Sequence, residues 1–244
     1  MRVLVTGASG AVGQPLCVEL RGRGDVVRGF DRAQEGGSDA CDEFVTGDLA
    51  DAALVRSAVD GVDAIVHLAA IPDEAPFADL VTPNFLGLFH VLDAARHYHV
   101  RRVILASTVQ AVAGAGAGKR STSLRVPTNH YALTKLFAED MGEMYARRFG
   151  LQVVAARIGW MVRSPREAAL IQELNLLEWY VSRRDVAEFL HAALHAPFQG
   201  FAAAYVIGRG GRDHFDFEPG LRLFGFEPRD SFPEGLPFPV PQPG

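Results

Sequence analysis

Apolar residues along the chain follow two alternating patterns. Short, almost continuous apolar runs rich in β-branched residues alternate with longer stretches in which apolar positions recur every three or four residues. The first pattern is typical of strands buried on both faces, and the second of amphipathic helices. The short runs predict strands at 3–5, 26–30, 43–46, 64–67, 102–106, 152–156 and 203–207. The longer stretches predict helices at 12–21, 52–59, 84–97, 131–148 and 184–195.

This alternation of strand and helix indicates βαβ units on a parallel sheet. Because such crossovers are right-handed, the expected fold is α/β, a doubly wound parallel Rossmann sheet. We expect residues 1–157 to form a dinucleotide-binding domain that also carries the catalytic residues. Residues 158–244 are less regular and end in a proline-rich tail. They predict a small, substrate-facing C-terminal subdomain that is integrated with the first domain.

Composition sets wide limits on function. The 244 residues are 48% hydrophobic and 22% charged, which is ordinary for a globular protein with a real core. The net charge is −5 and the basic residues form no long run, so neither nucleic acid nor a membrane is an expected partner. Two cysteines are too few for a disulfide framework. With no secretory signal and no apolar stretch long enough to span a bilayer, a cytoplasmic location is expected.

A glycine-rich turn follows the first predicted strand. Gly7, Gly10 and Gly13 are spaced G-x-x-G-x-x-G and open the first predicted helix. Glycines there permit close approach to a pyrophosphate, which the helix N-terminus attracts. Asp31 ends the second strand, where a carboxylate accepts hydrogen bonds from the adenosine ribose and repels a 2′-phosphate. We therefore expect NAD, although Arg32 is able to pair with that phosphate and leaves NADP as the less favoured alternative.

A second signal for chemistry is Tyr131 with Lys135, one of only two lysines in the chain. Residues four apart on a helix share a face, so the two side chains are expected to lie together. A free phenol titrates near ~10, and an adjacent ammonium and an oxidised nicotinamide both lower that pKa. An exposed helical pair is the alternative. Ser107 and Thr108 end the fifth strand, where a hydroxyl can bond to a substrate oxygen.

Taken together, these motifs resemble the extended short-chain dehydrogenase/reductases of the NAD-dependent epimerase/dehydratase family. The resemblance implies a catalytic triad in which Tyr131 is the acid/base, Lys135 its electrostatic partner and Thr108 the hydroxyl nearest the substrate. It rests on the glycine turn, on Asp31, and on the segments 47–49, 67–70, 84–87, 107–108, 131–135 and 157–159. The positions expected to bind the cofactor are Gly7, Gly10, Ala11, Val12, Asp31, Arg32, Asp48, Leu49, Leu68, Ala69, Ala70, Asn84, Tyr131, Lys135 and Ile158.

Within that family the chain resembles the uronate dehydrogenase branch, through R-I-G at 157–159, S-R-R-D at 182–185 and F-E-P-R-D-S at 226–231. Members of that branch carry Asn-His after the catalytic hydroxyl and Ser after R-I-G. This chain has Val109-Gln110 and Trp160 there. Arg163 and Arg166 are candidates for a carboxylate clamp. The residues expected to bind substrate are Ile71, Thr108, Val109, Gln110, Trp160 and Arg166, and no metal is expected.

The expected activity is oxidation or reduction of a hydroxyl or lactol carbon in a sugar or sugar acid. Two alternatives remain: a nucleotide-sugar epimerase/dehydratase that retains its NAD, and a non-catalytic regulator that binds NAD(H). The glycine-rich segment 111–118 is either a flexible connector or a mobile substrate loop. The resemblance also implies a homodimer through the helices at 84–97 and 131–148, with apolar contacts from Phe85, Phe89, Phe137 and Met141.

Overall fold

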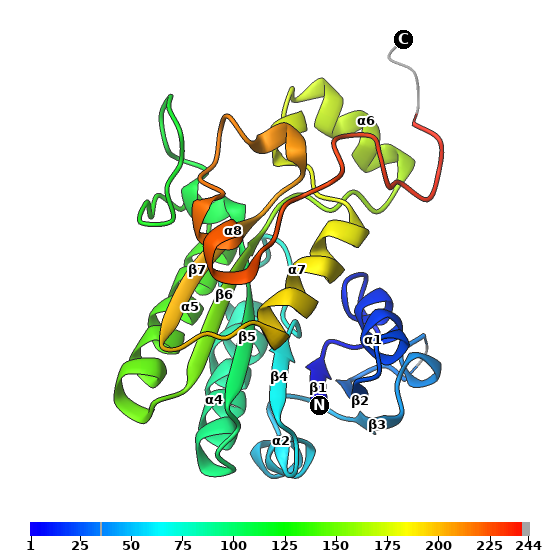
Figure 1. The fold of residues 1–244 in the computed structure, drawn as a ribbon, viewed down its shortest axis with the longest axis vertical. Helices are drawn as coiled ribbons and strands as arrows, with labels where there is room; N and C mark the ends of the chain where they lie inside the picture. Colours follow the sequence, from blue (N-terminus) through cyan, green and yellow to red (C-terminus); the bar gives the residue numbers. More distant parts are fainter. Residues whose placement is uncertain (35, 241–244) are drawn as a thin grey trace.

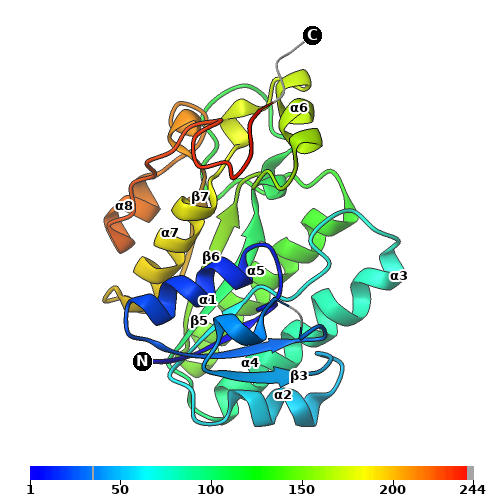
Figure 2. The same ribbon diagram turned by 90° about the vertical axis from the view of Figure 1, so that its right-hand side faces the viewer.

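The computed structural model describes residues 1–34 and 36–240 (Figures 1 and 2). Its centre is one sheet of seven parallel strands in the order β3-β2-β1-β4-β5-β6-β7. From β1 the chain first adds β2 and β3 on one side of β1, and then adds β4 to β7 on the other side. That reversal makes the boundary between β1 and β4 the topological switch point of the sheet. The strands are β1 (Arg2–Thr6), β2 (Val26–Asp31), β3 (Glu43–Thr46), β4 (Ala64–His67), β5 (Arg102–Thr108), β6 (Gln152–Ile158) and β7 (Phe201–Val206).

Helices cover both faces of the sheet (Figure 1). One face carries α1 (Gly13–Gly22) and α7 (Arg183–His195), which pack on each other. The other carries α2 (Ala52–Val59), α4 (Gly87–His97) and α5 (His130–Phe149). The shorter helices are α3 (Phe77–Leu80), α6 (Pro165–Glu173) and α8 (Glu218–Phe224). The predicted doubly wound α/β fold is confirmed. No helix among the residues described is long and apolar enough to cross a membrane.

The core is divided by the sheet into two layers. Along β1, Val3 and Val5 belong to the layer under α1 and α7, whereas Leu4 belongs to the layer under α2, α4 and α5. All three side chains are at most 1% exposed. Alternate residues of a strand point to opposite faces, so a strand covered on both sides must be apolar throughout. This is why the continuous apolar runs, rather than alternating ones, located the strands.

The helix predicted at 84–97 differs from the structure at its start. Helical backbone begins earlier, at Phe77, and runs through α3 and a π-helical turn (Val81–Leu86) before α4 begins at Gly87. Pro83 lies in the π turn and has no N–H to give to the carbonyl four residues earlier. A π turn widens the backbone locally and absorbs such a break without ending the helix.

The residues after β6 extend beyond the sheet and also complete it. β7 pairs with β6 in parallel, and α7 packs against β5, β6 and β7. Figure 2 shows α6 lying beyond the ends of the strands. The carboxyl ends of β1, β4, β5 and β6 therefore open onto a space that α6 and its neighbouring loops border. A division of the chain at residues 157 and 158 stays a prediction.

Candidate active site

A cavity of about 1040 Å³ runs along the carboxyl ends of the strands. One end is bordered by the glycine turn after β1, and the other by Trp160 and α6. Tyr131 and Lys135 of α5 and Thr108 of β5 line it between these ends. Ligands of doubly wound sheets bind outside the strand ends at the switch point, which is where this cavity lies. One continuous cavity thus joins the two signals that the sequence showed separately.

The glycine turn is packed so tightly that only glycine is tolerated at two of its positions. Gly7 has a φ of +75°, and a Cβ on it would lie 2.8 Å from the backbone nitrogen of Ala69. A Cβ on Gly13 would lie 2.0 Å from the carbonyl oxygen of Gly7. The turn is therefore packed against the end of β4 and the start of α1. The first turn of α1 has no acidic residue and no side-chain cap. The Gln14 N–H bonds to the Gly10 carbonyl and Pro15 has no N–H, so the Gly13 N–H is the group at the start of the helix that suits an anion.

The far end of the cavity carries two carboxylates and one guanidinium. Asp31 Oδ2 accepts a hydrogen bond of 3.0 Å from the Ser9 N–H, which fixes the carboxylate at the end of β2. The Arg32 side chain is 75% exposed, and its nearest acidic partner is Asp48 at 3.9 Å. With Asp31 and Asp48 both lining the cavity, the net charge here is negative and disfavours a 2′-phosphate. The residues present fit NAD better than NADP.

The three proposed catalytic side chains meet in the middle of the cavity. Asn129 caps α5 by accepting a hydrogen bond of 2.7 Å from the Ala132 N–H, so the helix begins just before Tyr131. Tyr131 and Lys135 are 7% and 8% exposed. The Lys135 ammonium lies 5.7 Å from the centroid of the Tyr131 ring, and the Thr108 hydroxyl lies beside the phenol, where it acts to lower the pKa of Tyr131. The exposed-pair alternative for Tyr131 and Lys135 is wrong.

Burial dominates the protonation of this pair. It raises the pKa of Tyr131 to about 12, with a further increase from the Asp73 carboxylate, while the bond to Thr108 and the charge of Arg163 act to lower it. Burial also lowers the pKa of Lys135 to about 8. The lowered phenol pKa expected from the sequence is thus outweighed by desolvation in the cofactor-free protein. A positive charge placed beside the phenol would reverse that balance, because it favours the phenolate.

A buried ion pair holds α5 on the sheet behind the site. Arg157 of β6 binds Glu139 of α5 through two bonds of 2.8 Å, and the two side chains are 1% and 7% exposed. Ser107 donates a hydrogen bond of 2.5 Å to the same carboxylate. Since the Ser107 proton is committed to Glu139, that hydroxyl can only accept bonds from the cavity. Of the two neighbouring hydroxyls, Thr108 is the one able to donate to a substrate.

The predicted substrate residues Ile71, Val109, Gln110 and Trp160 all line the cavity. Gln110 Oε1 accepts a hydrogen bond of 2.7 Å from Asn129, the residue that caps α5. The glycine-rich segment 111–118 is anchored at its start rather than loose. Its first two residues, Ala111 and Val112, are buried in a 3₁₀ turn (Val109–Val112), and the Gly114 N–H bonds to the Val126 carbonyl at 2.9 Å.

Two predicted site residues lie elsewhere. Arg166 is exposed on α6 and does not line the cavity; because Ser164 caps α6, it is Arg163, just before the cap, that borders the cavity. Asn84, predicted to bind the cofactor, is buried behind the wall, where its amide bonds to both backbone groups of Ile71 and to the Thr134 hydroxyl. It supports the cavity wall without facing the cavity. The remaining predicted cofactor and substrate positions all line the cavity.

The structure adds residues that no motif indicated. They lie in loops, in α3 and the π-helical turn after it, and in α6, segments whose direction a sequence pattern does not specify. Asp73 follows β4 in a loop at the strand ends, and its position after a strand was the one available signal. Glu167 is within 2.9 Å of the Arg163 guanidinium. The lining residues without a sequence signal are Pro72, Asp79, Thr82, Pro83, Met161, Glu167, Leu170 and Trp179.

Comparison with known proteins gives a consistent result. Residues 3–169 match the NAD dependent epimerase/dehydratase family. A uronate dehydrogenase from Pseudomonas putida is 32% identical over 233 residues, covering 94% of this chain and 84% of the relative. A glucuronic acid dehydrogenase from Chromohalobacter salexigens superposes with a TM-score of 0.81 at 29% identity, covering 94% and 85% of the two chains. A mutant uronate dehydrogenase from Agrobacterium tumefaciens, complexed with NAD, superposes at 0.80 and 27% identity, covering 98% and 91%.

Proposed function

Because this chain belongs to the NAD dependent epimerase/dehydratase family, we propose that it oxidises the anomeric carbon of a small uronate to a lactone. That it is an NAD-dependent oxidoreductase follows from the family and from the dehydrogenases that resemble it along most of their length. The substrate class is our proposal. The observation that carries it is a single cavity holding the glycine turn, the Thr108–Tyr131–Lys135 group and, beyond them, one arginine.

The chain's own residues then have distinct tasks. Tyr131 takes the proton of the anomeric hydroxyl, and Thr108, which lies beside the phenol, donates a hydrogen bond to the same substrate oxygen. Lys135 stabilises the phenolate by charge and is close enough to the cavity to hold ribose hydroxyls. NAD, when bound, supplies the hydride acceptor. Tyr131 and Lys135 are almost fully buried, so bulk solvent has little access to these two side chains.

Arg163 is the side chain that would select a carboxylate. Among the described residues lining the cavity, the arginines are Arg32 and Arg163, and Arg32 lies at the end assigned to the adenosine. The Arg163 side chain is 45% exposed and engages Glu167 through Nε at 3.1 Å and Nη2 at 2.9 Å. A guanidinium has five N–H donors, so one edge remains for a substrate carboxylate. The ion pair with Glu167 also fixes its orientation.

A matched pair of substrates tests this proposal. Glucuronate and glucose differ in having a carboxylate or a hydroxymethyl group at the last carbon. We expect NADH formation with glucuronate, and we expect Arg163→Gln to raise the KM for glucuronate without changing any activity on glucose. Arg166→Gln is the control, since Arg166 is a neighbouring exposed arginine outside the cavity. Equal turnover of both sugars, or an unchanged KM in Arg163→Gln, would exclude uronate selection by this residue.

The two alternative functions are less well supported. Uronate dehydrogenases match 94% of this chain at 28–32% identity, whereas a UDP-glucose epimerase of Bacillus subtilis, 29% identical, matches 78% of this chain and 65% of its own length. A retained cofactor that interconverts sugars would yield no net NADH. A non-catalytic regulator has no use for a buried tyrosine–lysine pair beside a threonine hydroxyl. Tyr131→Phe should therefore abolish turnover while leaving NAD binding, measured by calorimetry, within a few-fold of the parent.

We also propose that a second copy of the chain packs on the outer face of α3, α4 and α5. Apolar side chains are exposed along this face: Phe77, Val81, Leu86, Phe89, Leu133, Phe137 and Met144, each at least 36% exposed. Phe85 links Phe77 and Phe137, with ring centroids at 6.1 and 4.8 Å. Met141 packs on the chain's own core instead. An apolar strip of this kind on one face indicates an interface. Light scattering should show a dimer that Phe89→Lys dissociates.

A further inference from the structure

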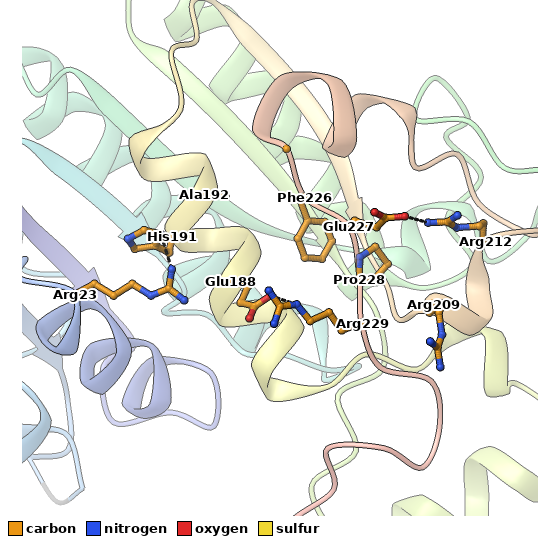
Figure 3. Close-up of a pocket in the computed structure, with 11 residues that line it drawn as sticks. Arg23, Glu188, His191, Ala192, Arg209, Arg212, Phe226, Glu227, Pro228 and Arg229 are labelled. Carbon is orange, nitrogen blue, oxygen red and sulfur yellow. Dashed lines mark hydrogen bonds and ion pairs between the residues drawn. The ribbon is translucent and has the colours of Figure 1, made fainter.

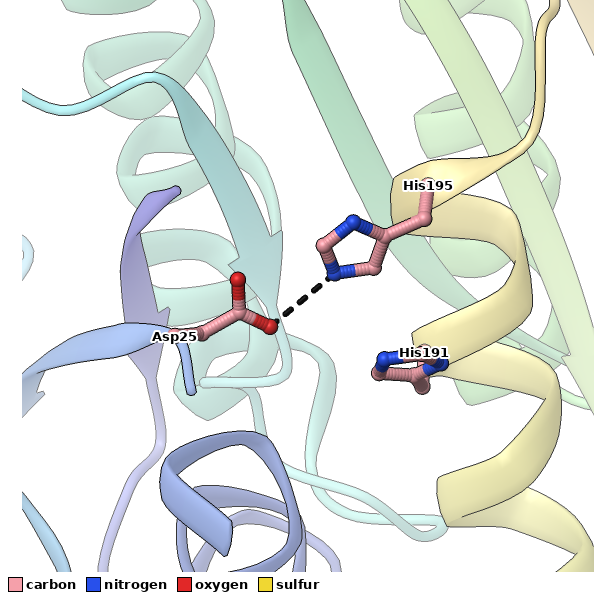
Figure 4. Close-up of side chains that lie close together, drawn as sticks. All are labelled: Asp25, His191 and His195. Atoms are coloured by element: carbon pink, nitrogen blue, oxygen red, sulfur yellow. Dashed lines mark hydrogen bonds and ion pairs between the residues drawn. The ribbon is translucent and has the colours of Figure 1, made fainter. Parts of the chain in front are cut away.

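A group of metal-ligating side chains lies at the opposite end of the strands from the cavity. Asp25 is in the turn between α1 and β2, and His191 and His195 are one turn apart on α7 (Figure 4). One nitrogen or oxygen atom from each lies within 4.8 Å of those from the other two. Asp31, which ends β2, borders the cavity, whereas Asp25 precedes the first residue of β2. The group and the catalytic residues are thus separated by the length of the strand.

The geometry of the group is close to that of a metal site. The Asp25 Oδ2 and His195 Nε2 atoms are 3.0 Å apart. Bonds of about 2.0–2.2 Å to a tetrahedral metal ion place two ligand atoms roughly 3.3 Å apart. The Asp25 and His195 atoms therefore have to move apart only slightly to accept an ion. The imidazole rings of His191 and His195 are 4.5 Å apart at 34°, as two histidines four apart on a helix should be.

A hydrogen bond to its other oxygen already holds the Asp25 carboxylate in a fixed orientation. The Asp25 Oδ1 atom accepts a hydrogen bond of 2.9 Å from the amino group of Met1, and its side chain is 4% exposed. This leaves Oδ2 toward the histidines. A bond to the second oxygen of a liganding carboxylate is the arrangement by which proteins hold metal ligands in place. The His195 side chain is 37% exposed, so solvent can supply a fourth ligand.

We propose that Asp25, His191 and His195 bind a transition-metal dication, with Zn²⁺ the ion that best fits two imidazoles, one carboxylate and water. The ion would tie α7 to the start of β2. This cross-link is not visible in the sequence, because Asp25 lies 166 positions before His191, and the sequence predicts no metal. Catalysis in the cavity does not depend on it, because no side chain of the group lines that cavity.

Arg23 sets the strength of this site. Its Nη1 donates to His191 Nδ1 at 3.2 Å (Figure 3). Its Nη2 pairs with Glu19 at 2.6 Å. An arginine nitrogen only donates, so His191 Nδ1 presents a lone pair toward Arg23. The guanidinium therefore competes with an ion for that lone pair and repels its charge. Replacing Arg23 with a neutral residue should therefore tighten metal binding. A metal ion bound adventitiously elsewhere on the chain would not respond to this substitution.

The hollow that Arg23 and His191 share with the C-terminal segment does not offer a competing anion site. It measures about 750 Å³ and is lined by four arginines (Figure 3). Arg212 pairs with Glu227 at 2.5 Å and Arg229 with Glu188 at 3.4 Å. Arg23 and Arg209 are each paired with a glutamate as well. The positive charge of the hollow is thus neutralised within the chain, which leaves the Asp25 group as the binding site.

The test uses the full-length chain free of any histidine tag. Titration with Co²⁺ should produce the intense visible absorption of a tetrahedral complex, saturating at one ion per chain, and Zn²⁺ should displace the cobalt. We expect His195→Gln to weaken binding at least about tenfold and Arg23→Gln to tighten it several-fold. His97→Gln, at an exposed histidine on α4, is the control and should bind as the parent does. NADH formation should be unchanged by added Zn²⁺.

Two results would overturn this proposal. One is saturable Co²⁺ binding that persists in a His191→Gln/His195→Gln double variant, which would locate the ion elsewhere. The other is the absence of a saturable tetrahedral signal in both the parent and Arg23→Gln. The Arg23 variant retains every ligand, so a failure of that protein to bind cannot be attributed to loss of a ligand or of the fold around it.

Discussion

The buried pair of Glu139 and Arg157 makes a sharp prediction about stability. Removing one member of such a pair leaves an uncompensated charge and typically costs about 3–5 kcal/mol, whereas replacing both with apolar residues is often neutral. Both side chains are almost inaccessible, so solvent cannot replace the lost partner. In Arg157→Met, the Glu139 carboxylate keeps one close donor, the Ser107 hydroxyl. We expect this variant to lose about 3–5 kcal/mol of unfolding free energy.

The double variant Glu139→Met/Arg157→Met should recover most of that loss. Urea unfolding followed by circular dichroism measures all four proteins of the cycle, and the coupling between the two sites should be several kcal/mol. Activity should behave differently from stability. The double variant no longer holds α5 on β5 and β6 through a fixed contact, and displacement of a catalytic group by about 1 Å can cost roughly 100-fold in rate.

Additive effects of the two single substitutions would refute this coupling, since they would mean that the charges do not depend on each other. A double variant that is as fast as the parent would refute the separate positioning role, because then the pair does not hold Tyr131 in place. Arg157→Lys gives an intermediate control. It keeps one charge but loses the two-pronged contact with Glu139, so it should retain part of the stability.

The residues of the cavity lead to three more predictions. Asp31→Ala should raise the kcat/KM ratio of NADP to NAD about tenfold, because a repulsive carboxylate is removed; Asp39→Ala, at a surface acid, should leave it unchanged. Thr108→Val should lower kcat about 100-fold while Thr108→Ser retains most of it, because the donor to the developing charge is lost only in the first. Burial lowers the pKa of Lys135 from 10.5 to about 8. Between pH 8 and pH 10.5 the folded protein therefore binds fewer protons than the unfolded chain. Its free energy of unfolding should rise as pH rises from about 8 toward 10. Lys135→Met should abolish that rise in urea unfolding experiments and be more stable than the parent below pH 8, by on the order of 3 kcal/mol. An equally steep rise in the variant would show that another group causes it.

Most of the fold could be predicted from the sequence because the strands are buried on both faces. Runs such as Arg102–Thr108 are largely apolar, and short runs of this kind between amphipathic helices are typical of the strands of a parallel sheet. The glycine turn and the Tyr131–Lys135 pair were predictable for a related reason, since each is local and its function depends on spacing along one element. Helix starts were less predictable, because the π turn around Pro83 is a local compromise that periodicity does not record.

What could not be predicted depends on how distant segments meet. Arg163 and Arg166 are equivalent in sequence, and only the cap at Ser164 and the direction of α6 decide that the first borders the cavity. Asn84 had the right residue type for a cofactor contact, but backbone groups of Ile71 satisfy its amide in the wall. The pairing of Glu139 with Arg157 joins a helix to a strand, and no spacing rule connects them.

The hydrogen bond between Gln110 and Asn129 has a consequence for anyone who redesigns this enzyme. Asn129 caps the start of the helix that carries Tyr131 and also holds Gln110, which lines the cavity where we propose that the sugar binds. Under that proposal, substrate recognition and placement of the base depend on one amide. A substitution at Gln110 chosen to admit a new sugar will also disturb the entry of the helix that carries the base. Mutant libraries should therefore vary Gln110 and Asn129 together, so that a hydrogen-bond donor at one position always faces an acceptor at the other.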